Sequence, residues 1–193
     1  MRLKIDFGMY AIRNSYVFFL LLGLVFFDLN AQQWSAKNGE ISFFSSAPLE
    51  DITAHTQKAV SVLDLETGRV TVTVPINSFV FKRRLMQEHF NENYMESERY
   101  PFAKFSGKIM DPVDWSIAGA YQVAVKGMME VHGVAKEYTT RVNLQVSAAQ
   151  IQAQTTFPIR LADHHITIPR IVRKNIAEVV EVKASLTYLP EKP

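Results

Sequence analysis

The sequence predicts an all-β protein, an eight-stranded antiparallel barrel with a short amphipathic helix closing one end. Three observations lead to this fold class. Apolar and polar residues alternate over most of the chain after residue 31, turn-forming residues separate the alternating runs, and one segment with helical spacing interrupts them. Parallel strands are buried on both faces and would read as continuous apolar runs, so the alternation favours antiparallel strands with one wet face.

The strands are recognised from apolar residues spaced two apart. In residues 70–76, valine or isoleucine at every second position alternates with threonine and proline. The same alternation recurs in residues 121–125, 142–146, 151–157 and 180–188, and residues 41–46 supply an early strand. With the shorter runs included, the chain holds about eight strands.

Turn-forming residues lie where neighbouring strands must reverse. The segments Glu-Thr-Gly at 66–68, Asp-Pro-Val-Asp at 111–114 and His-Gly at 132–133 each predict a hairpin connection. An up-and-down barrel closes such strands without an exposed edge, and a β-sandwich is the alternative arrangement. An eight-stranded barrel is just wide enough to hold one small or elongated ligand.

The helical pattern lies within residues 84–101. On a helical wheel, one half of this segment is apolar and the other half is polar. The apolar half holds Leu85, Met86, Phe90 and Tyr94, and the polar half holds Gln87, Glu88, Asn91 and Glu92. Met95 departs from the pattern. The segment predicts a short helix at one mouth of the barrel, either as a plug for the β core or as a lid over a ligand.

The first 31 residues have the features of a secretory signal peptide. A basic start with Arg2, Lys4 and Arg13 precedes an apolar run over residues 16–27, and Leu-Asn-Ala at 29–31 fits a cleavage site. We expect cleavage near Ala31 and a single mature domain over residues 32–193, located in the periplasm or secreted. The alternative is an uncleaved anchor, although the run is short for a bilayer span.

Composition excludes several classes of function. The chain carries 21 basic and 19 acidic residues, and removal of the signal region leaves 18 and 17, so the mature protein is nearly neutral. Nucleic-acid binding requires a concentrated basic face and is therefore not expected. The chain has no cysteine, which excludes disulfides, thiol catalysis, thiolate metal sites and a lipid-anchored lipoprotein.

Two segments together resemble a known family. Residues 89–105 run from His-Phe through Tyr-Met to Tyr-Pro-Phe-Ala-Lys-Phe, and residues 127–136 read Gly-Met-Met-Glu-Val-His-Gly-Val-Ala-Lys. Both are similar in order and spacing to landmarks of the YceI-like polyisoprenoid-binding family, and the resemblance extends over most of residues 38–189. It implies a lipocalin-like barrel in the periplasm, a polyprenyl quinone or polyprenyl phosphate in an apolar tunnel, and a possible homodimer.

Strand phase and the helical wheel assign a set of side chains to the barrel interior, where we expect them to contact the lipid. They are Phe43, Val72, Val74, Phe79, Phe81, Met86, His89, Phe90, Tyr94, Phe102, Val123, Val125, Leu144, Val146, Val182 and Leu186. His89 is placed on the buried arc of the helix, where it meets a polar head group or is a satisfied core histidine. Strand phase fits both a packed interior and a hollow one.

The basic cluster Lys82-Arg83-Arg84 lies at the start of the helix, and at a barrel mouth it could touch an anionic membrane surface transiently. His164 and His165 are adjacent on a predicted strand and point to opposite faces, so they do not share a metal ion. Glu130 and His132 share a face, but we expect His132 to be solvated at its turn.

The sequence contains no G-x-S-x-G, H-E-x-x-H or glycine-rich phosphate motif. We therefore expect no catalytic residues, no metal site and no cofactor besides the bound lipid. The leading hypothesis is a non-enzymatic carrier or store of an isoprenoid-type amphiphile. The rival hypotheses are an envelope interaction module with a filled barrel core, and an enzyme acting on a lipid head group with help from His89.

Overall fold

The structure is a computed structural model that describes residues 33–46, 49–169 and 176–191. The strands are β1 (Gln33–Ser45), β2 (Ile52–Asp64), β3 (Arg69–Pro75), β4 (Val80–Phe81), β5 (Phe102–Ile109), β6 (Gly119–Val131), β7 (Val134–Val146), β8 (Ile151–Arg160) and β9 (Val179–Pro190). The helical segments are η1 (Ile76–Ser78), α2 (Arg84–His89), the π-helical η2 (Phe90–Tyr94) and η3 (Leu161–His164). The expected signal peptide and its cleavage site lie outside the described residues and stay predictions.

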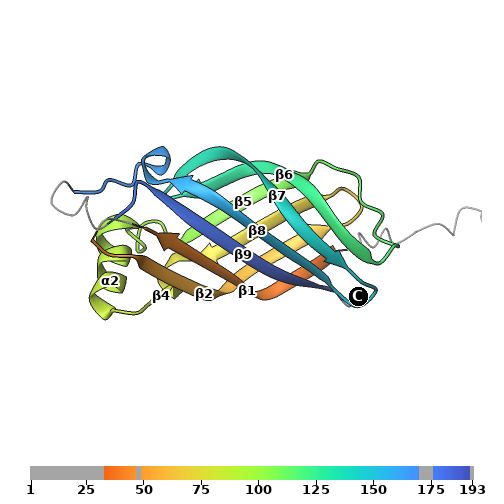
Figure 1. Ribbon diagram of the computed structural model, residues 1–193, viewed down its shortest axis with the longest axis horizontal. Helices are drawn as coiled ribbons and strands as arrows, with labels where there is room; N and C mark the ends of the chain where they lie inside the picture. Colours follow the sequence, from red (N-terminus) through yellow and green to blue (C-terminus); the bar gives the residue numbers. More distant parts are fainter. Residues whose placement is uncertain (1–32, 47–48, 170–175, 192–193) are drawn as a thin grey trace, which may run out of the picture. The chain divides into compact units, whose positions relative to one another are not determined.

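Eight strands close into an antiparallel barrel, as the alternation predicted (Figure 1). They are arranged in the order β1-β9-β8-β7-β6-β5-β3-β2, and β2 pairs again with β1. Trp34 faces Leu63 across one side of β1, and Phe43 faces Val182 across the other. The sandwich alternative is thereby excluded. Two-residue β4 pairs with β2 through Ala54 and His55 and leads into α2.

The predicted hairpin turns are present. Gly68, with φ of 69°, ends the turn between β2 and β3, and its amide donates to the Asp64 carbonyl at 2.9 Å. His132 and Gly133 form the two-residue turn between β6 and β7, with φ of 51° and 70°. Positive φ at both central residues defines the type I′ turn, whose twist matches that of the strands it joins.

The end of the barrel away from α2 is filled by side chains. The inward-facing Trp34, Leu65, Val123, Val146 and Ile151 are each at most 8% exposed. They come from the start of β1, the turn that follows β2 and the neighbouring parts of β6, β7 and β8. Close packing at this end gives the barrel a solid base.

The helix is shorter than predicted and changes pitch. The α2 segment continues into the π-helical η2, where the Met95 amide donates to the Phe90 carbonyl at 2.9 Å, five residues back. The wider turn shifts the phase of the following side chains. Met95 is therefore only 7% exposed. Leu85 lies before this turn, and although the wheel placed it on the apolar half, it is 60% exposed. Among the described residues, we find no helix with the length and apolar character needed to span a bilayer.

Candidate functional site

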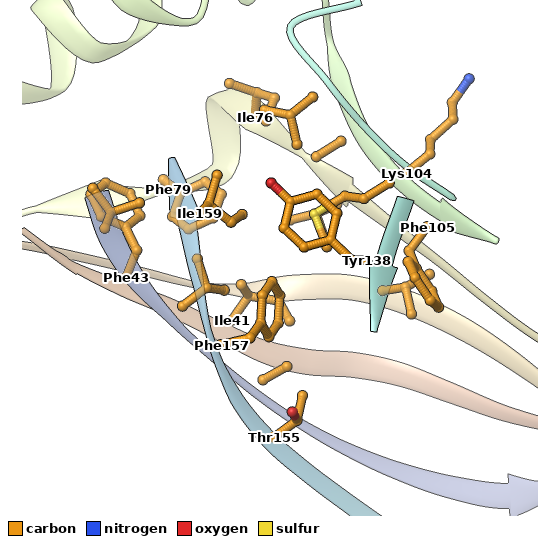
Figure 2. A pocket seen from close by; sticks show the side chains of 18 of the residues that line it. Ile41, Phe43, Ile76, Phe79, Lys104, Phe105, Tyr138, Thr155, Phe157 and Ile159 are labelled. Atoms are coloured by element: carbon orange, nitrogen blue, oxygen red, sulfur yellow. The ribbon is translucent and has the colours of Figure 1, made fainter. Parts of the chain in front are cut away.

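A cavity of about 460 Å³ lies inside the barrel beneath α2 and η2. All eight barrel strands contribute side chains to its wall, and Figure 2 shows several of them around the open space. Most lining side chains are aliphatic or aromatic, including Ile41, Val72, Phe79, Phe157 and Ile159. This volume is within the usual range of small-molecule sites, about 300–1,000 Å³. The barrel is thus packed at one end and hollow at the other.

Thirteen of the sixteen predicted interior residues line this cavity. They are Phe43, Val72, Val74, Phe79, Phe81, Met86, His89, Phe90, Tyr94, Val125, Leu144, Val182 and Leu186. Val123 and Val146 also point inward, each 2% exposed, but they belong to the packed end of the barrel and do not reach the cavity.

The prediction for Phe102 was wrong. Its side chain is 43% exposed, because the inward positions of β5 are Ala103, Phe105, Gly107 and Ile109. Two of these four residues carry little or no side chain, so the alternation in β5 has a weak signal. The aromatic residue at the first position of the strand led to the opposite phase.

Several cavity residues were missed by the sequence analysis. Met129, Tyr138, Phe157 and Ile159 all line the cavity from β6, β7 and β8. Met129 is in phase with the predicted inward Val125, and Tyr138 with Leu144, so extending those two runs toward the lid would have found both. Phe157 lies inside the predicted run over residues 151–157 and Ile159 continues it, but no residue of that run was assigned to the interior. The predicted runs over residues 121–125 and 142–146 stopped too early, because the next inward positions toward the lid are Gly127 and Thr140.

A pair of facing glycines lies on the inner face of the barrel wall beside the Phe105 ring. Gly107 of β5 and Gly127 of β6 are cross-strand partners, and both face inward. A Cβ atom added at Gly127 would lie 2.4 Å from the Gly107 Cα, and the Phe105 ring also covers this position. The two strands can approach here only because both residues lack a side chain. The far end of the Phe105 ring occupies the space that a side chain at either position would need.

Four phenylalanines join the lid to the barrel wall. The Phe90 ring of η2 lies 5.6 Å from the rings of both Phe43 and Phe79 and 4.9 Å from that of Phe81, between ring centroids. Such separations are typical of favourable aromatic pairs. Phe90 is therefore an apolar contact that holds the lid, formed by α2 and η2, against the barrel wall.

Polar side chains surround the mouth beside α2. His89 lines the cavity but is exposed, so its predicted place on a buried arc of the helix was wrong. Arg83 pairs with Glu50 at 2.9 Å, and Arg84 pairs with Glu88 at 2.8 Å, which neutralises much of the predicted basic cluster. Tyr94 also lines the cavity, and burial raises the pKa of its hydroxyl above the ordinary value.

The two adjacent histidines lie on the 3₁₀ turn η3 and its end, not on the predicted strand. His164 is fully buried. Its Nδ1 lies 3.0 Å from the Val134 carbonyl and its Nε2 lies 2.9 Å from the Tyr138 hydroxyl. A carbonyl only accepts, so Nδ1 donates and Nε2 accepts from the tyrosine, an arrangement that a neutral imidazole satisfies. Burial, with a contribution from Asp163, raises the pKa of Tyr138.

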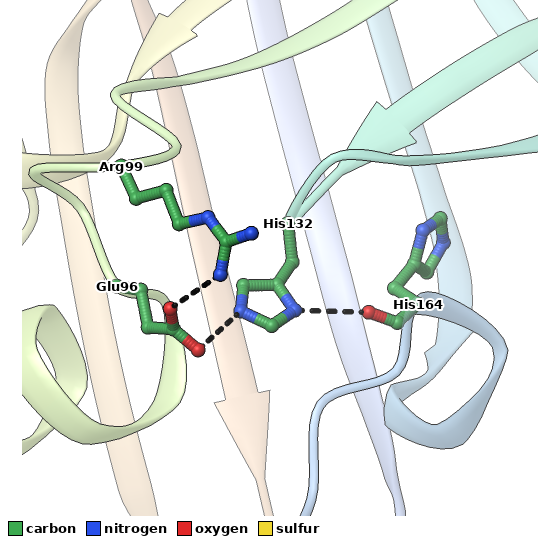
Figure 3. A network of polar contacts seen from close by, with 4 residues as sticks. All are labelled: Glu96, Arg99, His132 and His164. Atoms are coloured by element: carbon green, nitrogen blue, oxygen red, sulfur yellow. Dashed lines mark hydrogen bonds and ion pairs between the residues drawn. The ribbon is translucent and has the colours of Figure 1, made fainter.

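His132 is also less solvated than predicted, with a side chain 11% exposed. It bridges Glu96 and the His164 carbonyl, and Glu96 in turn contacts Arg99 (Figure 3). This network joins the segment after η2, the β6–β7 turn and η3. Within the described ranges, no three His, Asp or Glu side chains are grouped as metal ligands.

A family model for the YceI-like domain matches residues 33–188. The chain belongs to the YceI-like family. Among solved structures, a polyisoprenoid binding domain from Saccharophagus degradans, implicated in plant cell wall breakdown, is similar with a TM-score of 0.69 and 20% identity. That match covers 83% of this chain and 99% of the other.

Two further structures share the fold of this YceI-like chain. BcnA from Burkholderia cenocepacia has a TM-score of 0.66 and 17% identity, over 77% of this chain and 95% of its own. The YceI protein from Campylobacter jejuni has a TM-score of 0.60 and 14% identity, over 75% and 88%. A search of curated proteins found no match.

Both segments that resemble YceI-like landmarks lie at the hollow end of the barrel. Residues 89–105 contain the end of α2, η2 and the first half of β5, and residues 127–136 contain the β6–β7 turn. The two segments meet where Glu96 contacts His132. The family signature therefore coincides with the closure of the cavity rather than with the packed base.

Proposed function

We propose that this YceI-like protein binds one isoprenoid-type amphiphile, such as a polyprenyl quinone or polyprenyl phosphate, and carries or stores it without chemical change. The observation that carries this proposal is the apolar cavity beneath the aromatic contacts of α2 and η2. Its wall is built by side chains such as Ile41, Val72 and Leu186, with few polar groups among them. The name of the similar Saccharophagus domain, a polyisoprenoid binding domain, agrees with a ligand of this class.

The chemistry of the wall suits a long hydrocarbon. Transfer of each CH₂ group from water into such an interior contributes about 0.8 kcal/mol, so a prenyl tail needs few polar contacts. Residues such as Met86 and Met129 add flexible, polarisable walls that adapt to methyl branches. The hollow interior also weighs against the interaction module with a filled core.

The polar end of the amphiphile belongs at the mouth. His89 is both exposed and in contact with the cavity, and Tyr94 lies one turn further along the same helical segment. The opposite half of the cavity, near Leu63 and Leu144, is aliphatic and adjoins the packed base. We therefore place the tail toward the base and the head group near His89.

The proposed cellular setting follows from the N-terminal segment. Export to the periplasm or outside the cell would bring the protein to membranes that hold isoprenoid lipids. Lys82, together with the exposed Leu49, Val80 and Leu85 near the mouth, offers a small surface for transient membrane contact. The ion pairs of Arg83 and Arg84 make this contact more apolar than electrostatic. Homodimerisation stays a prediction from the family resemblance.

The direct experiment is mass spectrometry of the organic extract of the purified mature protein. A stoichiometric isoprenoid in the extract supports the proposal. The variant Ala184→Trp places an indole ring in the cavity, since Ala184 is a small lining residue of β9. Ala120→Trp adds the same group on the exposed outer face of β6.

We expect Ala184→Trp to fold but to yield at least tenfold less lipid, and Ala120→Trp to match the wild type. A wild-type protein that is repeatedly lipid-free and binds no added prenyl quinone would disprove the proposal. Equal lipid content in the two tryptophan variants would place the ligand outside the barrel.

A further inference from the structure

Three residues with strained backbone conformations lie at the lid end of the cavity, away from the packed base. Glu96, His132 and His165 all have positive φ, with values of 43°, 51° and 57°. Such values are uncommon for residues with a side chain and persist only where neighbouring contacts enforce them. The three residues follow η2, form the β6–β7 turn and end η3, respectively. These three segments are distant in the sequence, and they meet around His132.

The imidazole of His132 lies between two hydrogen-bond acceptors (Figure 3). Its Nδ1 is 3.2 Å from the His164 carbonyl oxygen, and its Nε2 is 3.3 Å from Glu96 Oε1. A carbonyl and a carboxylate can only accept, so both ring nitrogens must carry a proton for both bonds to form. The neutral imidazole has a single N–H and would turn a lone pair toward one of the two acceptors.

The charged and titratable neighbours of His132 are few. From the segment after η2, Glu96 also pairs with Arg99 at 3.6 Å, and the Tyr100 ring lies 4.6 Å from the His132 ring, between centroids. Arg99 lies 5.0 Å above the Tyr100 ring. These contacts keep the Glu96 carboxylate beside the imidazole.

On the η3 side, both nitrogens of the His164 imidazole are already hydrogen-bonded, Nδ1 to the Val134 carbonyl and Nε2 to the Tyr138 hydroxyl. The nearby Asp163 carboxylate contributes to the raised pKa of Tyr138. Because the neutral form of His164 satisfies both of its bonds, His132 is the imidazole of this network whose contacts depend on its charge.

Each segment of the network carries a cavity residue next to it. Met95 precedes Glu96, Val131 precedes His132 and Ile166 follows His165. With Ile76, these three side chains form a small buried cluster, and all of them line the cavity. A change in the network at the surface therefore moves the wall of the cavity directly.

We propose that the Glu96–His132–His164 contacts form a proton-dependent latch, which holds the cavity closed when His132 is protonated and speeds ligand exchange when His132 is neutral. This inference rests on the proposed function, since it describes how the same site is opened. Histidine is the side chain that in general gains or loses a proton near neutral pH, so pH is the variable that tests the latch.

The test measures the transfer of retinol, a fluorescent isoprenoid alcohol, from the full-length mature protein to neutral phosphatidylcholine vesicles. We expect wild-type dissociation to be roughly threefold to fivefold faster at about pH 8 than at about pH 5.5, the effect of one partly exposed ion pair. A rate that is equal at both pH values would overturn the proposal.

Two variants separate the latch from a merely structural role. In Glu96→Gln the amide can donate to the neutral Nε2, so dissociation should be slow at both pH values. In His132→Asn the side chain is too short to bridge the two acceptors, while Asn-Gly remains a favoured type I′ pair, so dissociation should be fast at both. His165→Asn, also at a positive-φ position, is the control and should keep the wild-type dependence.

Hydrogen exchange of the ligand-free protein tests the latch without retinol. After correction for intrinsic rates, amides of residues 95–100 should exchange threefold or more faster at the higher pH in the wild type and not in Glu96→Gln. Exchange that is identical in both proteins would overturn the latch. Latch-dependent exchange in a protein that binds neither retinol nor an added prenyl quinone would instead disprove the proposed function, and with it the role of the latch in ligand exchange.

Discussion

Tyr188 shows how a single polar group is accommodated inside the barrel wall. Its hydroxyl lies 2.7 Å from Ser61 Oγ, which itself donates to the Thr71 carbonyl at 2.6 Å. The tyrosine is therefore the donor in the first bond. Burial raises the pKa of Tyr188 to about 12 from the ordinary 10.0, because the phenolate would lose its hydration.

This pKa predicts a loss of stability at high pH. The folded-state value lies above the unfolded one, so the contribution is complete below pH 10 and is lost as the pH rises toward 12. Two pKa units correspond to about 2–3 kcal/mol. Tyr188→Phe should cost about 1 kcal/mol at neutral pH, through the lost hydrogen bond, and should show a smaller alkaline decline. Urea unfolding of both proteins from pH 8 to 12 measures the difference. Parallel declines would contradict this explanation.

The glycine pair between β5 and β6 gives a second prediction about single residues. In Gly127→Ala the new Cβ would lie 2.4 Å from both the Gly107 Cα and the Ser106 carbonyl oxygen, so the strands must separate. Overpacking of this kind costs about 1–3 kcal/mol.

Gly119→Ala on the same strand is the matched control, since the nearest atom, Tyr121 Cε2, is 3.9 Å from the added Cβ. Its stability should be unchanged or slightly higher, because alanine restricts the unfolded chain. Urea denaturation checks both variants, and equal midpoints would show that the close approach of the strands is not required.

Individual residues also show what the sequence could reveal about the site. Val72, Val74 and Val182 were placed correctly in the wall because β-branched residues at every second position fix the phase of a strand. Phe102 was misplaced because Ala103 and Gly107, which face inward, carry almost no hydrophobic signal. Tyr138 was missed because a side chain with a polar hydroxyl gives a weak hydrophobic signal at an inward position. Its hydrogen-bond partner His164 comes from a distant segment.

At the scale of elements, the lid depends on one aromatic side chain. Phe90 contacts the rings of Phe43, Phe79 and Phe81, whereas Leu85 on the same helical segment is exposed to solvent. Phe90→Ala removes a half-buried ring, so it should cost about 2 kcal/mol, less than the 3–5 kcal/mol of a fully buried phenylalanine. Leu85→Ala should cost less than about 0.5 kcal/mol.

The lid variants also differ in their expected effect on exchange. Without the Phe90 ring the lid opens more often, so retinol should leave Phe90→Ala about tenfold faster, and Leu85→Ala should resemble the wild type. Thermal unfolding and stopped-flow transfer to vesicles measure the two quantities. A destabilised Phe90→Ala with an unchanged dissociation rate would mean that ligands leave by another route.

The helix illustrates the limit of pattern analysis at this scale. A wheel with regular α-helical spacing assigned Leu85 to the buried half and left Met95 unexplained. The π-helical turn at Phe90–Tyr94 inserts an extra residue into the last turn, and this rotates Met95 toward the cavity. Such a turn depends on tertiary contacts and has no signature in the periodicity. The existence of the lid was predictable, but its exact buried face was not.

At the scale of the whole molecule, the barrel combines a packed base with a hollow end. Trp34, Val123 and Ile151 fill the base, while small lining residues such as Ala103 and Ala184 leave space beneath the lid. Alternation identified the inward face of the strands but could not distinguish these two halves, because both are lined by apolar residues. Whether side chains meet across the interior depends on their size at facing positions on distant strands.

This division predicts that a ligand stabilises the molecule as a whole, because an occupied cavity adds contacts that exist only in the folded barrel. At a free retinol concentration one hundred times Kd, the stabilisation is about 2.7 kcal/mol, which for a domain of this size raises Tm by roughly 5–10 °C. Protein stripped of co-purifying lipid on a hydrophobic resin is heated with and without retinol, followed by circular dichroism. Ala120→Trp, changed on the outer face, should show the same increase as the wild type. Ala184→Trp, with its cavity blocked, should show an increase below about 1 °C. An equal rise in all three proteins would mean that retinol stabilises the barrel from its outer surface, and the cavity would then have no part in binding.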